Sequence, residues 1–378
     1  MIFLKKLKIS LLIIFILPLF NLFKPTKASL EFCQNAKSAI LFETNNNTVL
    51  YEKNINEKLP IASMTKVMTL SLVYDSIKAS KLSYDDVLTT SSYAKSMGGS
   101  QVYLEEGEKS KLKDLIKCVC IASANDAAVT IAEAISGSEE AFVLEMNKKA
   151  KELNMNNTNY IDCTGLTDVN HYSTAFDMSI ISSYLVTNHP EVLEFTSLKE
   201  SYFREDTKEP FWLVNTNKLL GKYEAIDGLK TGWTNEAGYC ISVTGKENNL
   251  RLVAVVMGEE SPIVRNNEAL ELIRYGFSNY ELKEFVSENF IYLKIYSIFY
   301  KNNYINIISK DKIEIVIKKN ESDNYKINFI YNKSYNKLGL VEIIYNENII
   351  HSSYLEYENQ ERRNMFELWI EVIRRMFS

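Results

Sequence analysis

The 378-residue sequence is poor in glycine, proline, cysteine and histidine, with 13, 6, 5 and 3 residues of each type. So little glycine and proline excludes a collagen-like chain and a proline-rich linker. The cysteine count is odd and the spacing fits no zinc motif, so we expect buried reduced thiols rather than a disulfide framework. A formal net charge of −5 gives no general attraction for nucleic acid, and no nucleic-acid partner is expected.

What the sequence does contain is a globular composition, with 46% hydrophobic and 24% charged residues. This composition excludes wholesale disorder and a polytopic membrane protein. The length is enough for roughly two to three domains.

The first 28 residues have the layout of a secretory signal peptide. Three lysines precede the apolar run Ile9–Phe23, and Thr26-Lys27-Ala28 supplies small residues at a cleavage site. An uncleaved anchor is the alternative, but the run is shorter than the ~20 residues that span a bilayer. Cleavage would remove five lysines and no acidic residue, changing the net charge from −5 to −10. We expect export to the outer face of the cytoplasmic membrane or the cell wall.

Residues 29–280 are predicted to form one α/β unit that begins with a β-hairpin. Its expected strands are Ser38–Glu43, Thr48–Lys53, Tyr239–Thr244 and Arg251–Met257. Its expected helices are Ser63–Ser76, Leu112–Ile135, Phe142–Leu153, Thr174–Thr187 and Glu268–Tyr275. Residues 281–358 change to short β-branched and aromatic runs, which predict a small all-β domain with strands at Tyr304–Ile308, Ile313–Ile317, Lys326–Tyr331 and Leu340–Tyr345.

Residues 359–378 predict an amphipathic helix. Apolar side chains from Met365 to Phe377 fall on one broad arc, and charged side chains fall on the other. One interpretation is a helix that lies in the membrane interface, with Trp369 at the headgroup boundary. The other is a terminal helix docked on the β domain. The pattern alone does not favour either.

Ser63-Met64-Thr65-Lys66 is an S-x-x-K motif at the predicted start of a helix. The spacing places the hydroxyl and the amine on one helix face, where a lysine of depressed pKa can activate a serine. The motif alone is weak, because it also occurs at Ser92, Ser110, Ser309 and Ser334. Only Ser63 follows a proline and opens a long apolar helix, where backbone N–H groups are free.

Two further short motifs follow along the chain. Ser123-Ala124-Asn125 is S-x-N in an apolar setting, where polar side chains must be satisfied internally or line a cleft. Lys230-Thr231-Gly232 is K-T-G, which combines a cation, a hydroxyl and a glycine into an edge suited to a carboxylate. S-x-N is common by chance, and K-T-G alone is typical of an ordinary turn, but the order S-x-x-K, S-x-N, K-T-G matches the set found in class A β-lactamases and penicillin-binding proteins.

With these motifs, the chain resembles the D-alanyl-D-alanine carboxypeptidases, which are low-molecular-mass penicillin-binding serine peptidases. Further supporting strings are His171–Asp177, Asp227–Thr234 and Ala237–Cys240. The resemblance covers about residues 35–280. It implies a β-lactamase/DD-peptidase-like domain with an antiparallel sheet and a helical subdomain. The β region and the terminal helix resemble the family's C-terminal domain and membrane anchor in layout only.

The resemblance also implies roles for particular residues. Ser63 would be the acylated nucleophile, Lys66 its general base and Ser123 the proton relay to the leaving D-alanine. Substrate would be bound by Asn125, Lys230, Thr231, Gly232, Trp233 and Arg265, with the N–H groups of Ser63 and Trp233 forming the oxyanion hole. His171 is not needed as a base and is expected to be structural. No metal and no organic cofactor is implied.

The expected partners are therefore a peptidoglycan stem peptide ending in D-Ala-D-Ala, and β-lactams as inhibitors. Two rivals share the fold, a β-lactamase and a DD-endopeptidase. The E-x-x-L-N string that supplies the deacylating glutamate of class A β-lactamases is absent between Asn125 and Lys230. A rival of another class is a non-catalytic peptidoglycan-binding protein, which would not require a paired nucleophile and base.

Overall fold

The computed structural model describes residues 32–334 and 337–377. The signal peptide predicted for residues 1–28 lies outside this range. Within it, no helix combines the length and the apolar character needed to cross a membrane.

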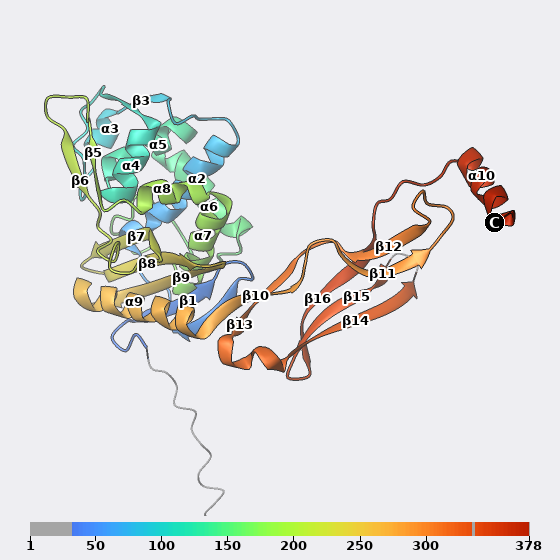
Figure 1. Ribbon diagram of the computed structural model, residues 1–378. Coiled ribbons are helices and arrows are strands. Elements are labelled where there is room, and N and C mark those ends of the chain that lie inside the picture. The colour runs from blue at the N-terminus through green and yellow to red at the C-terminus, as the bar shows by residue number, and fades with distance from the viewer. Residues whose placement is uncertain (1–31, 335–336, 378) are drawn as a thin grey trace, which may run out of the picture. The chain divides into compact units, whose positions relative to one another are not determined.

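The first part of the described chain is organised around an antiparallel sheet of five strands in the order β2-β1-β9-β8-β7. The strands are β1 (Ser38–Glu43), β2 (Thr48–Lys53), β7 (Ile226–Thr234), β8 (Gly238–Glu247) and β9 (Leu250–Glu259). Helix α9 (Pro262–Asn279) packs on one face, and α7 (Ala175–Asn188) packs on the other (Figure 1). Because both faces are covered, every residue of β1 is buried. The predicted hairpin agrees with β1 and β2 at both ends.

A helical subdomain lies on the α7 side of the sheet (Figure 1). It contains the 3-10 turn η1 (Ala62–Thr65) and the helices α2 (Lys66–Lys78), α3 (Ser92–Lys95), α4 (Leu112–Ile121), α5 (Asn125–Ser136), α6 (Glu139–Glu152) and α8 (Leu193–Thr196). Two short antiparallel strand pairs, β3 (Val87–Thr89) with β4 (Lys109–Lys111) and β5 (Glu200–Phe203) with β6 (Phe211–Val214), complete it. Thr174 caps α7, because its side chain accepts a hydrogen bond from the backbone N–H of Asp177.

The single helix predicted over Leu112–Ile135 is wrong. The chain leaves the helix after Ile121, and Ser123 adopts a positive φ of 64° before α5 begins at Asn125. Positive φ is costly for a residue with a Cβ, so tertiary packing must hold this break in place. The apolar periodicity continues through the break, so the break could not be predicted from the sequence.

From Tyr280 to Tyr357 the regular structure is β, as predicted, apart from the 3-10 helix η3 (Lys319–Asn324). Strand β10 (Tyr280–Val286) pairs with β13 (Ile313–Lys318), and a second sheet has the order β11-β12-β16-β15-β14. Its strands are β11 (Phe290–Tyr296), β12 (Tyr304–Ser309), β14 (Tyr325–Ser334), β15 (Lys337–Tyr345) and β16 (Asn348–Tyr357). The core of this β region includes Val286 of β10 together with Ile307, Val341, Ile343 and Leu355 of the second sheet. Strands β10, β11 and β16 were not predicted.

Helix α10 (Met365–Met376) follows, with Asn364 and Glu367 forming a capping box at its start. Arg363 fixes this start, because its guanidinium donates to the carbonyls of Ile298 and Lys301 at 2.8 Å each.

The core beneath the sheet gives a first prediction. Phe42 of β1 is fully buried and meets Phe176 of α7 edge to face, with ring centroids 6.4 Å apart. We expect Phe42→Ala to lower the free energy of unfolding by about 3–5 kcal/mol, because it removes this contact and leaves a cavity. Urea denaturation measures the loss. The control Val169→Ala alters a side chain that is 92% exposed and should change stability by less than about 0.5 kcal/mol. Equal effects of the two substitutions would contradict the packing of Phe42 against Phe176.

Candidate active site

Ser63 lies in a turn that is enclosed by backbone from two sides. A Cβ at Gly165 would lie 1.9 Å from the Ala62 carbonyl oxygen, and a Cβ at Gly232 would lie 2.7 Å from the Ile61 carbonyl oxygen. Only glycine permits such approaches, and Gly165 also has a φ of +88°. The turn is therefore fixed between β7 and the loop that contains Gly165, and Ser63 itself stays partly exposed.

The Lys66 amine follows one turn later and is fully buried. Its Nζ donates to Ser63 Oγ at 2.9 Å, to Asn125 Oδ1 at 2.6 Å and to the Thr164 carbonyl at 2.7 Å. These three acceptors come from η1, α5 and the loop before Gly165. Three acceptors match the three hydrogens of an ammonium group.

The orientation of the Asn125 amide is set by its second contact. Its Nδ2 donates to the Gly98 carbonyl at 2.7 Å, so Oδ1 must face Lys66. Asn125 Oδ1 and the Thr164 carbonyl can accept hydrogen bonds but cannot donate them. When Lys66 is neutral, these two groups hold its two hydrogens, and its lone pair is left facing the Ser63 hydroxyl.

Burial lowers the pKa of Lys66 from 10.5 to about 8, because the charged form loses its hydration. Nearby Cys163, Asp162, Asp126 and Glu139 oppose this shift only in part. An appreciable fraction of the amine is therefore neutral near pH 7. The arrangement can deprotonate Ser63 and so form an acyl-serine.

The loop that carries Thr164 is held by a side-chain network. Asp162 Oδ1 accepts from the backbone N–H groups of Thr164 and Gly165, both at 2.6 Å. Thr65 donates its hydroxyl hydrogen to the Ala62 carbonyl, so it accepts from His171 Nε2 at 2.7 Å. His171 Nδ1 lies 3.3 Å from the Ile161 backbone nitrogen and 3.4 Å from Asp162 Oδ2. His171 connects the loop to the Ser63 turn.

Ser123 lies at the break between α4 and α5. Its Oγ is buried and has no hydrogen-bond partner among the described residues. A buried hydroxyl without a partner is unusual, and it has free capacity for a bound molecule. Among the described residues its hydroxyl bonds to neither the Ser63 nor the Lys66 side chain, whereas Asn125, two residues later, accepts from Lys66.

The K-T-G residues lie in β7. Lys230 is 1% exposed, and its Nζ donates to the Thr231 carbonyl at 3.0 Å. Burial, together with the positive charges of Lys66 and Arg265, holds the pKa of Lys230 well below its usual value. Thr231 Oγ1 donates to Thr216 Oγ1 at 2.8 Å. Trp233 is 53% exposed at the edge of the site.

Arg265 lies in α9 and is 5% exposed. Its Nη2 donates to Asn266 Oδ1 at 2.9 Å, and its Nη1 to the Cys240 carbonyl at 3.5 Å. The charge of Arg265 acts on Lys230, but Arg265 does not line the cavity around Ser63.

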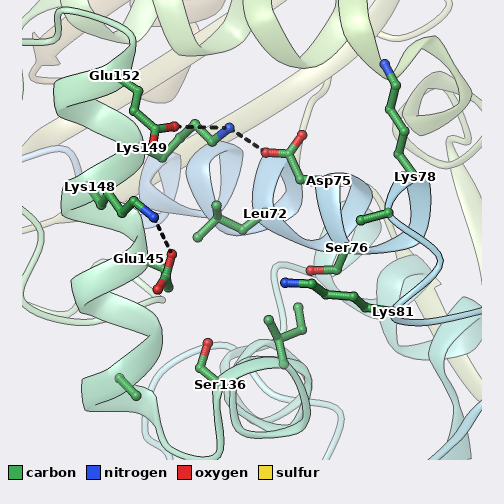
Figure 2. A pocket seen from close by; sticks show the side chains of 13 residues that line it. Leu72, Asp75, Ser76, Lys78, Lys81, Ser136, Glu145, Lys148, Lys149 and Glu152 are labelled. Carbon is green, nitrogen blue, oxygen red and sulfur yellow. Dashed lines mark ion pairs between the residues drawn. The ribbon is translucent and has the colours of Figure 1, made fainter.

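A cavity of about 530 Å³ opens at Ser63. It is lined by Ser63, Gly99, Ser100, Asn125, Thr164, Gly165, Leu166, Thr167, Trp233, Thr234, Asn235 and Glu236. A larger cavity, of about 720 Å³, lies between α2, α5 and α6 and contains no residue of the three motifs (Figure 2). There Lys148 pairs with Glu145, and Lys149 pairs with both Asp75 and Glu152. The chemistry is therefore assigned to the smaller cavity.

Several residues of the site were missed from the sequence. The Thr164 carbonyl is a main-chain group, so no residue type in the sequence could have indicated that it accepts from Lys66. Asp162, followed by Thr164 and Gly165, is an Asx-type turn pattern that could have indicated an ordered loop. Gly98 and Thr216 carried no signal. Within the described residues no group of three or more His, Cys, Asp or Glu is arranged to hold a metal ion. Cys118, Cys120, Cys163 and Cys240 are buried thiols.

Comparison with known proteins finds relatives that match the part of the chain containing the three motifs. The sequence profile of D-alanyl-D-alanine carboxypeptidases matches residues 25–261. The D-alanyl-D-alanine carboxypeptidase DacF of Bacillus subtilis is 44% identical over 298 residues, which cover 79% of this chain and 76% of that protein.

Two solved structures resemble the chain. Penicillin binding protein 5 from Haemophilus influenzae has a TM-score of 0.78 and 28% identity, covering 88% of this chain and 98% of that one. Penicillin-Binding Protein D2 from Listeria monocytogenes, in its ampicillin-bound form, has a TM-score of 0.59 and 33% identity, covering 66% and 99%. The fold class predicted from the sequence is confirmed, and the chain belongs to the D-alanyl-D-alanine carboxypeptidase family.

Proposed function

We propose that the protein is a serine-type D-Ala-D-Ala carboxypeptidase that removes the terminal D-alanine from peptidoglycan pentapeptide stems. The observation that carries the proposal is the buried Lys66 amine 2.9 Å from Ser63 Oγ, with a pKa lowered to about 8. Binding alone requires no nucleophile paired with a base, so this pair disfavours a non-catalytic peptidoglycan-binding protein.

The first step is acylation of Ser63. Ser63 Oγ attacks the carbonyl of the penultimate D-alanine, and its proton passes to the neutral Lys66 amine. The N–H groups of Ser63 and Trp233 stabilise the oxyanion. When the C–N bond breaks, Ser123 donates its hydroxyl proton to the leaving D-alanine nitrogen, and the proton held by Lys66 passes to Ser123, which leaves Lys66 neutral again. Water then hydrolyses the ester and restores the Ser63 hydroxyl. No metal or organic cofactor takes part in this scheme.

The same cavity holds the substrate. Lys230 and Thr231 bind the terminal carboxylate, because a buried cation beside a hydroxyl is the environment that an anion prefers. Asn125 binds the peptide backbone, and Gly232 lets β7 approach the turn that carries Ser63. Arg265 adds positive charge from beneath the site. Penicillins acylate the same serine, and the ampicillin-bound Listeria relative supports this.

Labelling with a fluorescent penicillin tests the proposal. We expect one covalent label per chain, carried by Ser63 in the mapped peptide and absent in Ser63→Ala. The matched control is Ser92→Ala, because Ser92 opens another S-x-x-K motif whose lysine, Lys95, pairs instead with Glu105 at 2.6 Å. The control should label like the wild type.

Activity assays then separate the rival functions. A diacyl-D-Ala-D-Ala peptide should release D-alanine, whereas rapid penicillin turnover without D-alanine release would identify a β-lactamase. Faster cleavage of cross-linked dimers than of pentapeptides would identify an endopeptidase. If the fluorescent penicillin labels no residue, the remaining interpretation is a non-catalytic peptidoglycan-binding protein.

The pKa of Lys66 predicts how acylation depends on pH. A lysine whose pKa is about 8 gains a proton as the pH falls, and the protonated form cannot act as a base. The second-order rate constant of penicillin acylation should therefore fall about tenfold per pH unit below pH 8 and level off above it. Lys66→Arg should abolish acylation at every pH, because a guanidinium stays charged. A flat profile in a chain that remains folded by circular dichroism would exclude Lys66 as the base.

The division of the chain follows the same proposal. Residues 1–28 direct export, 29–280 carry the catalytic site, 281–358 form the β domain, and 359–378 contact the outer face of the cytoplasmic membrane. The exposed apolar arc of α10 supports the last role, with Met365, Phe366, Trp369 and Met376 each more than 60% exposed. Such an arc fits a membrane interface better than it fits water.

Vesicle co-sedimentation tests the membrane contact. Substituting Phe366 and Trp369 by serine should reduce binding of the full chain to phosphatidylglycerol/phosphatidylcholine vesicles about tenfold or more, because large apolar side chains leave the interface. Val169→Ser, at an exposed apolar residue of the catalytic part, should leave binding unchanged. Equal binding of all three proteins would favour a helix that docks on the β domain.

A further inference from the structure

The wall of the Ser63 cavity has one feature that the proposed reaction does not use. Of the described residues that line the cavity, Glu236 is the one with a formally charged side chain. The others are serine, threonine, asparagine, glycine, leucine and tryptophan. Glu236 therefore places a single carboxylate on an otherwise uncharged wall.

Glu236 lies in the turn between β7 and β8 and is exposed. Thr167 Oγ1, from the loop that follows Gly165, donates to Glu236 Oε2 at 3.0 Å. Both residues line the cavity, so this bond joins two segments of its wall. Hydrogen bonds from its own backbone N–H and from Thr167 lower the pKa of Glu236, so it is ionised at neutral pH. A carboxylate accepts about four hydrogen bonds, so capacity remains for a ligand.

The cations of the site lie elsewhere. Lys66 and Lys230 are 0% and 1% exposed, and neither lines the cavity. A substrate whose carboxylate is bound by Lys230, as proposed above, therefore meets negative charge only where it passes Glu236. A peptide with a carboxylate at its C-terminus and an ammonium group further back is electrostatically complementary to this arrangement.

We propose that Glu236 is a specificity residue that binds a free side-chain ammonium of the peptide residue preceding D-Ala-D-Ala, with Thr167 positioning its carboxylate. This inference rests on the proposed carboxypeptidase function. The preferred substrates are then stems in which a diamino acid keeps its side-chain amine unmodified. Stems whose amine is already acylated, as in a cross-link, are poorer substrates.

The expected effect is moderate because Glu236 is exposed. A solvent-accessible ion pair predicts a preference of about twofold to fivefold at low ionic strength. Salt should weaken it, because charges at the cavity mouth are screened over ~10 Å at 0.1 M.

The test compares two peptides, Nα-acetyl-Lys-D-Ala-D-Ala with a free ε-amine and its Nα,Nε-diacetyl counterpart. The quantity measured is the ratio of their kcat/KM values for D-alanine release by the full chain. The wild type should prefer the free amine, and Glu236→Gln should bring the ratio to about one, because the amide keeps an acceptor for Thr167 but loses the charge.

Two controls separate charge from loop structure. Thr167→Val removes the bond but keeps the carboxylate, so the ratio should stay above one whatever happens to the absolute rates. Glu224→Gln removes the same charge outside the cavity and should leave the ratio unchanged. A wild-type ratio of one, or an equal loss on both peptides in Glu236→Gln with the ratio preserved, overturns the inference while the carboxypeptidase proposal stands. No D-alanine release from either peptide by the wild type overturns both.

Discussion

The site depends on one buried amine and the three oxygens around it. Ser63 Oγ, Asn125 Oδ1 and the Thr164 carbonyl come from three segments far apart in the sequence, and each lies within 2.9 Å of Lys66 Nζ. A buried amine without such partners would lose several kcal/mol of hydration without compensation, on the order of what a marginally stable domain has available. The η1 turn, the start of α5 and the loop before Gly165 are therefore constrained together.

Close backbone packing makes this constraint rigid. Gly165 and Gly232 approach the Ser63 turn from two sides at distances where no Cβ fits. His171 adds a side-chain connection through Thr65, which lies between the nucleophile and Lys66 in sequence. A site built in this way has little freedom to adjust, so its geometry is preorganised before a substrate arrives. Substituting either glycine would therefore displace Ser63 and its turn rather than disrupt the sheet.

The motifs and the β1–β2 hairpin could be predicted because their signal is local: a fixed spacing, an alternation, a turn. The break at Ser123 could not, since its positive φ is imposed by packing and the apolar pattern continues through it. The Thr164 carbonyl was invisible for another reason, because a main-chain acceptor depends on where the chain runs and not on which residue it belongs to. Strand β16 was missed because nearly all of its side chains are exposed, which removes the alternation that identifies a strand.

The electrostatics around Lys230 explain why the site suits an anion. Lys230 is buried, and among the described residues its Nζ donates to the Thr231 carbonyl alone. The nearby charges of Lys66 and Arg265 oppose its protonation. A ligand carboxylate placed beside Lys230 would supply the missing negative charge and raise the pKa of that lysine toward its usual value. The repulsion built into the free protein thus becomes attraction for a terminal carboxylate, so a peptide amide at the same place would gain much less.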